Sequence, residues 1–171
     1  MKDVFNVRRS ADGDDVLKEL NGQVLGVKAV TAGDEIEDTD SGKLILLTAA
    51  SGTVTLPAAS AGLNFKILIK VGTTDVCDIA AASGDCFYGT VHVYDSNTDG
   101  EEMAQQTETY ATATGTVADF DTLALDGNAT TTGCTAGDII ELYAVDDTAW
   151  HVKAILGTIG TPASIDVITA S

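Results

Sequence analysis

Short runs of alternating apolar and polar residues, each ended by a turn signal, constrain this fold more than any other sequence feature. Residues 64–71 (NFKILIKV) put Phe65, Ile67 and Ile69 on one face and two lysines on the other. A period of two residues is typical of a strand that buries one face. Similar strands, separated by turns rich in Gly, Asp and Ser, are expected at residues 43–48, 53–56, 76–80, 89–94, 117–125, 138–145 and 150–155.

This spacing predicts an all-β fold, because no stretch of useful length has the 3.6-residue period of a helix. Eight or so short strands indicate an antiparallel β-sandwich, either jelly-roll-like or a small barrel. Pro57 and Pro162 fall where strands are expected to finish. Trp150, the only tryptophan, is expected to pack in the core, with a contact between subunits as the alternative. A chain of 171 residues can bury such a core without a disulfide or a metal.

Charge divides the chain into two parts. Residues 1–28 hold five basic and five acidic side chains, whereas the rest holds four basic and 21 acidic ones, so the whole formal charge of −17 lies beyond residue 28. We therefore expect an extended N-terminal arm over residues 1–30, with a short helical turn near residues 16–20, and a β-sandwich domain over residues 31–171. The alternative is a loosely ordered terminus without a partner.

The same acidic excess argues against nucleic acid or a membrane surface as a partner. No apolar run approaches the roughly 20 residues that a membrane helix needs. The first ten residues (MKDVFNVRRS) lack the apolar block of a secretory signal. We therefore expect no nucleic-acid and no membrane partner, and synthesis in the cytoplasm.

Residues 95–102 (DSNTDGEE) match the first six positions of a calcium-binding loop, with Asp95, Asn97 and Asp99 as oxygen ligands. The twelfth position holds the neutral Gln106 instead of a bidentate glutamate. Solvated hairpin tips use the same residue types for their turn geometry alone. We expect a hairpin tip without metal or cofactor, and keep a calcium loop as the alternative.

Catalytic signatures are missing around the two histidines. His92 and His151 lie in alternating runs and are expected on exposed strand faces, without a nucleophile elbow or a zinc-protease helix nearby. The three cysteines lack a CxxC spacing and are expected to be buried, with a disulfide between Cys77 and Cys86 as the alternative. We predict that the protein is not an enzyme; a hydrolase would need one of these histidines beside a nucleophile.

Several segments together resemble a recurring module of tailed-bacteriophage virion proteins, which reads "ADSGK, short strand, GxxVTLPAxxAGLxFxF" and closes on "GDxxELxxDGTxWxV". The similar segments are residues 38–44 (DTDSGKL), 52–58 (GTVTLPA), 61–67 (AGLNFKI), 137–142 (GDIIEL) and 147–152 (DTAWHV). They follow the module's order from about residue 38 to residue 153. Residues 87–118 form an insertion that the module does not explain.

The resemblance implies a capsid decoration (cement) protein on the outside of a head built from an HK97-like major capsid protein. It implies a homotrimer on the capsid surface of the virion, made in the host cytoplasm. The arm is then expected to contact the capsid or a neighbouring subunit, because it offers an apolar anchor and arginines that pair with carboxylates. The expected contact residues are Val4, Phe5, Val7, Arg8 and Arg9.

Similar modules occur in head fibres and tail fibres, so a fibre domain that binds a host receptor or a glycan is the alternative function. In that case tyrosines would line the sugar site. The candidates are Tyr88, Tyr94, Tyr110 and Tyr143.

Overall fold

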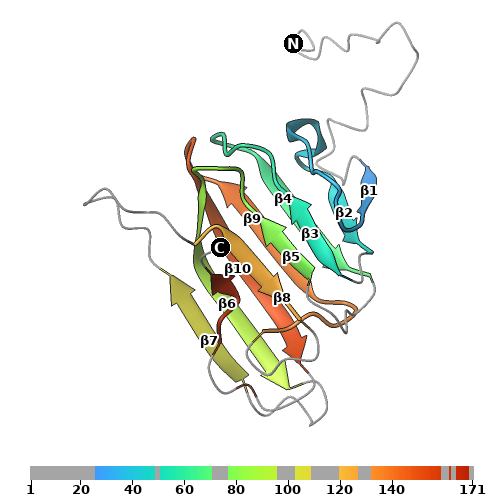
Figure 1. Cartoon of the computed structure of the whole chain (residues 1–171), viewed down its shortest axis with the longest axis vertical. Helices are drawn as coiled ribbons and strands as arrows, with labels where there is room; N and C mark the ends of the chain where they lie inside the picture. Colours follow the sequence, from blue (N-terminus) through green and yellow to red (C-terminus); the bar gives the residue numbers. More distant parts are fainter. Residues whose placement is uncertain are drawn as a thin grey trace, which may run out of the picture.

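The structure, a computed structural model, describes residues 26–48, 51–70, 77–95, 103–108, 120–126, 132–158, 162 and 165–169. These residues form strands in two sheets, which overlap in Figure 1. In chain order the strands are β1 (Val27–Val30), β2 (Leu44–Leu47), β3 (Gly52–Thr55), β4 (Asn64–Ile69), β5 (Cys77–Ala80), β6 (Cys86–Asp95), β7 (Met103–Glu108), β8 (Thr122–Leu125), β9 (Ile139–Ala144), β10 (Ala149–Thr158) and β11 (Ile168–Thr169).

The large sheet has the strand order β1-β2-β4-β9-β10-β6-β7, and the small sheet has the order β11-β8-β5-β3. One cluster of buried side chains joins them, with Ile67 from the large sheet and Ile79 from the small sheet among its members. Burial of this apolar surface holds the sheets face to face. The all-β sandwich is therefore confirmed, and two separate open sheets exclude the barrel.

The prediction that the sheets are antiparallel is wrong, because both sheets are mixed. Parallel pairing joins β1 to β2, β2 to β4, β6 to β10 and β3 to β5. From β2 to β5 the chain alternates between the sheets: β2 and β4 belong to the large sheet, β3 and β5 to the small one. After each passage through the other sheet the chain returns in its earlier direction, so β4 runs parallel to β2 and β5 runs parallel to β3.

Most expected strands are present, but β6 and β10 are longer than predicted, with ten residues each. Phe65, Ile67 and Ile69 are buried in β4, as the alternation predicted. Three strands were not predicted: β1, β7 and β11. Strand β1 puts Val27–Val30 in the large sheet, inside the range assigned to the arm.

Helical structure in the described residues is limited to one 3₁₀ turn, η1 (Asp38–Asp40), between β1 and β2. In the described part of the chain, no helix has the length and apolar character needed to cross a membrane.

Candidate functional site

The predicted contact residues of the arm lie outside the described residues: Val4, Phe5, Val7, Arg8 and Arg9. Asn97 and Asp99 of the calcium-like motif also lie outside them, whereas Asp95 is buried at the end of β6. Within the described residues, no group of three or more His, Cys, Asp or Glu side chains could hold a metal ion.

Gln106, the twelfth residue of that motif, joins the edge strands of the two sheets. Its Oε1 accepts hydrogen bonds from the backbone N–H groups of Val167 (2.8 Å) and Ile168 (2.9 Å), and its Nε2 donates to the carbonyl of Ile168 (2.9 Å). The side-chain amide thus pairs with the chain at β11 as a neighbouring strand would. Gln106 therefore has a structural role, because its Oε1 and its Nε2 are both hydrogen-bonded to the backbone at β11.

The cysteines and the histidines occupy different surroundings. Cys77, Cys86 and Cys134 are buried and unbridged, so the alternative of a Cys77–Cys86 disulfide is not realised in the structure. Burial, with Cys134 and Asp78 nearby, raises the pKa of the Cys77 thiol to about 11. His92 and His151 lie on the side of the large sheet that faces away from the core. The described residues therefore bring no accessible thiol beside either histidine.

Trp150 is fully buried in the shared core, and its ring centroid lies 5.5 Å from that of Phe65. Core packing of this side chain is confirmed.

The side of the large sheet that faces away from the small sheet is called the outer face here. Every second residue of a strand lies on it, and the register aligns these residues in rows across β4, β9, β10 and β6. Its central residues are Asn64, Lys66, Leu68, Ile139, Glu141, Tyr143, His151, Lys153, Ile155, Tyr88, Thr90, His92 and Tyr94.

Large apolar side chains are exposed on the outer face. Ile139 and Ile155 are directly paired across β9 and β10, and Tyr143 lies on the same side of β9. Val27 in β1 and Met103 in β7 extend the set to both ends of the sheet. These five side chains are between 37% and 64% exposed. Ile139 and Ile155 form a contiguous exposed apolar pair near the middle of the sheet, and grouped apolar side chains of this kind are typical of contact surfaces.

Aromatic side chains form a second row, in which His151 lies between Tyr143 and Tyr88. The rings of Tyr88 and His151 meet edge to face, with centroids 5.3 Å apart. Tyr94 lies further along β6 on the same side. Three of the four tyrosines considered for a sugar site thus share the outer face, and Tyr110 lies outside the described residues.

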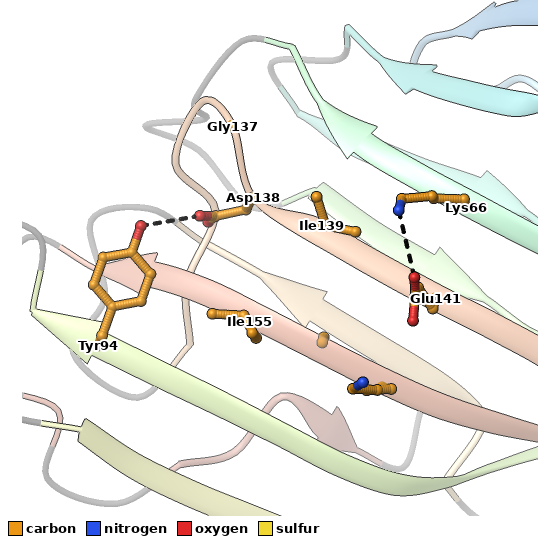
Figure 2. A pocket seen from close by; sticks show the side chains of 9 residues that line it. Lys66, Tyr94, Gly137, Asp138, Ile139, Glu141 and Ile155 are labelled. Carbon is orange, nitrogen blue, oxygen red and sulfur yellow. Dashed lines mark hydrogen bonds and ion pairs between the residues drawn. The ribbon is translucent and has the colours of Figure 1, made fainter.

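Two lysines lie in the central row of the outer face. Lys66 pairs with Glu141 at 3.5 Å, as Figure 2 shows. Lys153 is directly opposite Glu141 in the register of β9 and β10, yet it makes no ion pair with any described residue. Two cations against one carboxylate leave this row positive, on a chain whose formal charge is −17.

A hollow of about 320 Å³ opens on the outer face beside these lysines. Lys66, Lys153, Ile139 and Ile155 line it, and we call it the lysine hollow. Figure 2 shows that the charged side chains and the isoleucines come from neighbouring strands and surround the same space.

Asp138 closes one end of the lysine hollow and fixes three segments there. It accepts hydrogen bonds from the backbone N–H groups of Thr135 (2.7 Å) and Gly157 (2.8 Å), from the Thr135 hydroxyl (3.0 Å) and from the Tyr94 hydroxyl (3.4 Å; Figure 2). Burial raises the pKa of Asp138, and the hydrogen bonds from Gly157, Thr135 and Tyr94 offset part of that rise.

The connection between β1 and β2 carries the opposite charge. Glu35, Glu37 and Asp38 are exposed there and line a second hollow together with Pro57 and Leu63. We call these three carboxylates the acidic corner.

Asp40 lies buried beneath the acidic corner and binds the nearby cations. It accepts hydrogen bonds from the ammonium groups of Lys28 and Lys43 and from the backbone N–H of Glu37 (3.0 Å). Burial alone would raise the pKa of Asp40, but these hydrogen bonds lower it to about 2. Both lysines are engaged by Asp40, and no ion pair among the described residues involves the exposed carboxylates of the corner.

The low pKa of Asp40 predicts how stability depends on pH. A carboxyl group whose pKa is lower in the folded chain stabilises the fold above its unfolded pKa of 3.8, and this contribution is lost as the pH falls toward 2. We expect Asp40→Asn to cost about 2 kcal/mol at pH 7 and to remove this part of the acid dependence. Urea unfolding at pH 7 and pH 2.5 measures both effects.

The matched control is Asp38→Asn, an exposed carboxylate in the same turn, for which we expect a change below about 0.5 kcal/mol. Equal loss of stability on acidification in wild type and in Asp40→Asn would contradict the role given to Asp40.

Comparison of the chain with protein-family models, with curated proteins and with solved structures gives no match. The outer face and the acidic corner are therefore interpreted from their own chemistry.

Proposed function

We propose that this chain is a structural virion protein that decorates the outer surface of a phage capsid. It stabilises the capsid by bridging subunits of an HK97-like major capsid protein. The observation that carries the proposal is the outer face, where exposed apolar side chains and two lysines gather on one sheet of an otherwise acidic chain. A face of this composition suits a protein surface as its partner. The resemblance of residues 38–153 to phage virion modules supplies the class of partner.

The segments that carry the resemblance hold the sandwich together. Asp40 binds two lysines, Asp138 accepts four hydrogen bonds, and Trp150 fills the core. These segments supply a stable body for the outer face, and the predicted arm lies outside them.

Decoration requires binding and no reaction. A hydrolase would need His92 or His151 beside a nucleophile, and the thiols of the described residues are buried. A homotrimer that engages several equivalent capsid sites would multiply weak contacts, because the second and third sites bind at a high effective concentration. The bridge must then break before the shell can rupture.

Deleting residues 1–10 tests the proposal. We expect at least tenfold weaker binding to undecorated heads, since the deletion removes Phe5 and the two arginines that follow it. Cosedimentation of purified protein with heads measures the affinity and the copy number, which should reach hundreds per head.

The matched control deletes only residues 1–3, which keeps Val4 to Arg9, and should bind like the full chain. Undiminished binding after deletion of residues 1–10 would refute the arm as the contact. Failure of the full chain to bind heads would refute the proposed function itself.

The row of Tyr143, His151 and Tyr88 favours one other candidate, a head-fibre or tail-fibre domain that binds a host receptor or glycan. Aromatic and polar side chains on one flat face are the groups that such a ligand needs. Copy number separates the two candidates, because a fibre domain is present in tens of copies per particle at most.

A further inference from the structure

We propose that copies of this chain bind one another head to tail, with the acidic corner of one copy seated in the lysine hollow of the next. This inference deepens the homotrimer of the proposed function, on which it rests, by naming the two surfaces that meet.

The lysine hollow is suited to a carboxylate carried on an apolar surface. Glu141 already pairs with Lys66, so Lys153 is left without a counter-ion among the described residues. Ile139 and Ile155 beside it are exposed and offer apolar contact around that charge. Partial burial of Lys153 by a partner without an anion would cost free energy, whereas an incoming carboxylate would offset that cost.

The acidic corner has the complementary composition. Glu35, Glu37 and Asp38 are exposed, and Pro57 and Leu63 supply apolar surface in the same hollow. Lys28, Lys43 and Asp40 together carry one net positive charge, so the three carboxylates of the corner leave an excess of negative charge for a partner.

Charge also explains why the partner is a second copy and why the contact is head to tail. Beyond residue 28 the chain has 21 acidic side chains and only four basic ones. Two of those four line the lysine hollow, and Lys43 is bound to Asp40. Glu141 and Asp138 also line the hollow, but Glu141 pairs with Lys66 and Asp138 accepts hydrogen bonds from Thr135, Gly157 and Tyr94. Lys153 is therefore the charge in the hollow that can attract a carboxylate of another acidic copy. A contact between two different surfaces is heterologous, and such contacts form a ring such as a trimer where the rotation between copies closes, and a filament where it does not.

Charge reversal on each surface tests the inference with the isolated protein. Lys153→Glu alters the hollow, and the double variant Glu37→Lys/Asp38→Lys alters the corner. We expect each to weaken self-association at least tenfold in sedimentation equilibrium, because like charges then face each other. Lys70→Glu is the matched control, since it makes the same charge change at an exposed lysine that does not line the hollow, and it should associate like wild type.

Mixing the two altered proteins gives the decisive result. The Lys153→Glu chain keeps an intact corner, the double variant keeps an intact hollow, and the two reversed surfaces attract each other. We therefore expect the mixture to associate where each protein alone does not, which also demonstrates that both are folded. A mixture that stays monomeric, or a reversal that leaves association unchanged, would overturn the inference.

Binding to undecorated heads, measured in parallel, separates this inference from the proposed function. Self-association without binding to heads would refute decoration and leave the contact between copies standing. A wild-type chain that is monomeric and loses head binding on Lys153→Glu would assign the lysine hollow to the capsid, and would overturn the contact between copies.

Discussion

Replacement of Gly89 by alanine is expected to destabilise this protein by more than about 4 kcal/mol, enough to unfold many domains of this size. Gly89 lies within β6 and pairs with Val152 of β10, in the middle of two ten-residue strands. Its φ angle is 136°, and an added Cβ would lie 2.0 Å from the carbonyl oxygen of Val152 and 2.8 Å from its nitrogen. Those atoms are backbone, so the methyl group can be accommodated only if the strands separate.

Gly62→Ala is the matched control, because it has the same conformational problem without the collision. Gly62 has a φ angle of 100°, and nothing lies within 4 Å of the position of a Cβ. We expect a loss of about 1 kcal/mol from backbone strain alone. Urea unfolding of both variants, monitored by circular dichroism, gives the cost of the collision as their difference. Equal losses would show that β6 and β10 do not approach each other at Gly89.

The strands differ in how well they can be predicted from the sequence. The alternation in β4 is regular, so its start at Asn64 and its buried face are correctly predicted, although the strand ends at Ile69 and not at residue 71. In β7, Met103–Glu108, most side chains are polar and Thr107 is the only β-branched residue, so the sequence gives no strand signal. The pairing of β7 with β6 supplies its hydrogen bonds instead.

The direction of pairing had one sequence signal, in β2. Leu44–Leu47 is apolar at every position, which is typical of strands in parallel sheets, although in β2 only Ile45 and Leu47 are buried and Leu44 and Leu46 are partly exposed. The strand indeed lies between β1 and β4 and runs parallel to both. In the other strands, apolar and polar residues alternate because one face is buried. This pattern is the same in parallel and in antiparallel pairing, so the mixed sheets could not be predicted from it.

The candidate site could be predicted only in its parts. The alternation of β4 places Lys66 on the exposed side. Its meeting with Glu141 and Lys153 depends on β4, β9 and β10 being neighbours, which no local pattern of the sequence specifies. Asp40 and Asp138 are recognisable as turn residues, but the donors that surround them come from segments distant in the chain.

Asp40 and Asp138 are both buried but differ in their hydrogen-bond partners, and therefore in how their contributions to stability respond to pH. Asp40 is surrounded by two ammonium groups, which lower its pKa, so its contribution to stability is lost as the pH falls. The hydrogen-bond partners of Asp138 are all neutral, and burial raises its pKa. A carboxyl group whose pKa is higher in the folded chain than in the unfolded chain contributes most to stability at low pH. This contribution is lost as the pH rises through the pKa of the folded chain.

Asp138→Ala is expected to cost about 3 kcal/mol, because two backbone N–H groups lose a buried acceptor. Asp138→Asn is the control and should cost less, because it keeps one acceptor oxygen and the shape of the side chain. Urea unfolding between pH 5 and pH 8 should show the difference between wild type and Asp138→Ala narrowing as the pH rises. A loss below about 1 kcal/mol in Asp138→Ala would mean that Asp138 does not hold the ends of β6, β9 and β10 together, and the wall of the lysine hollow would then need another explanation.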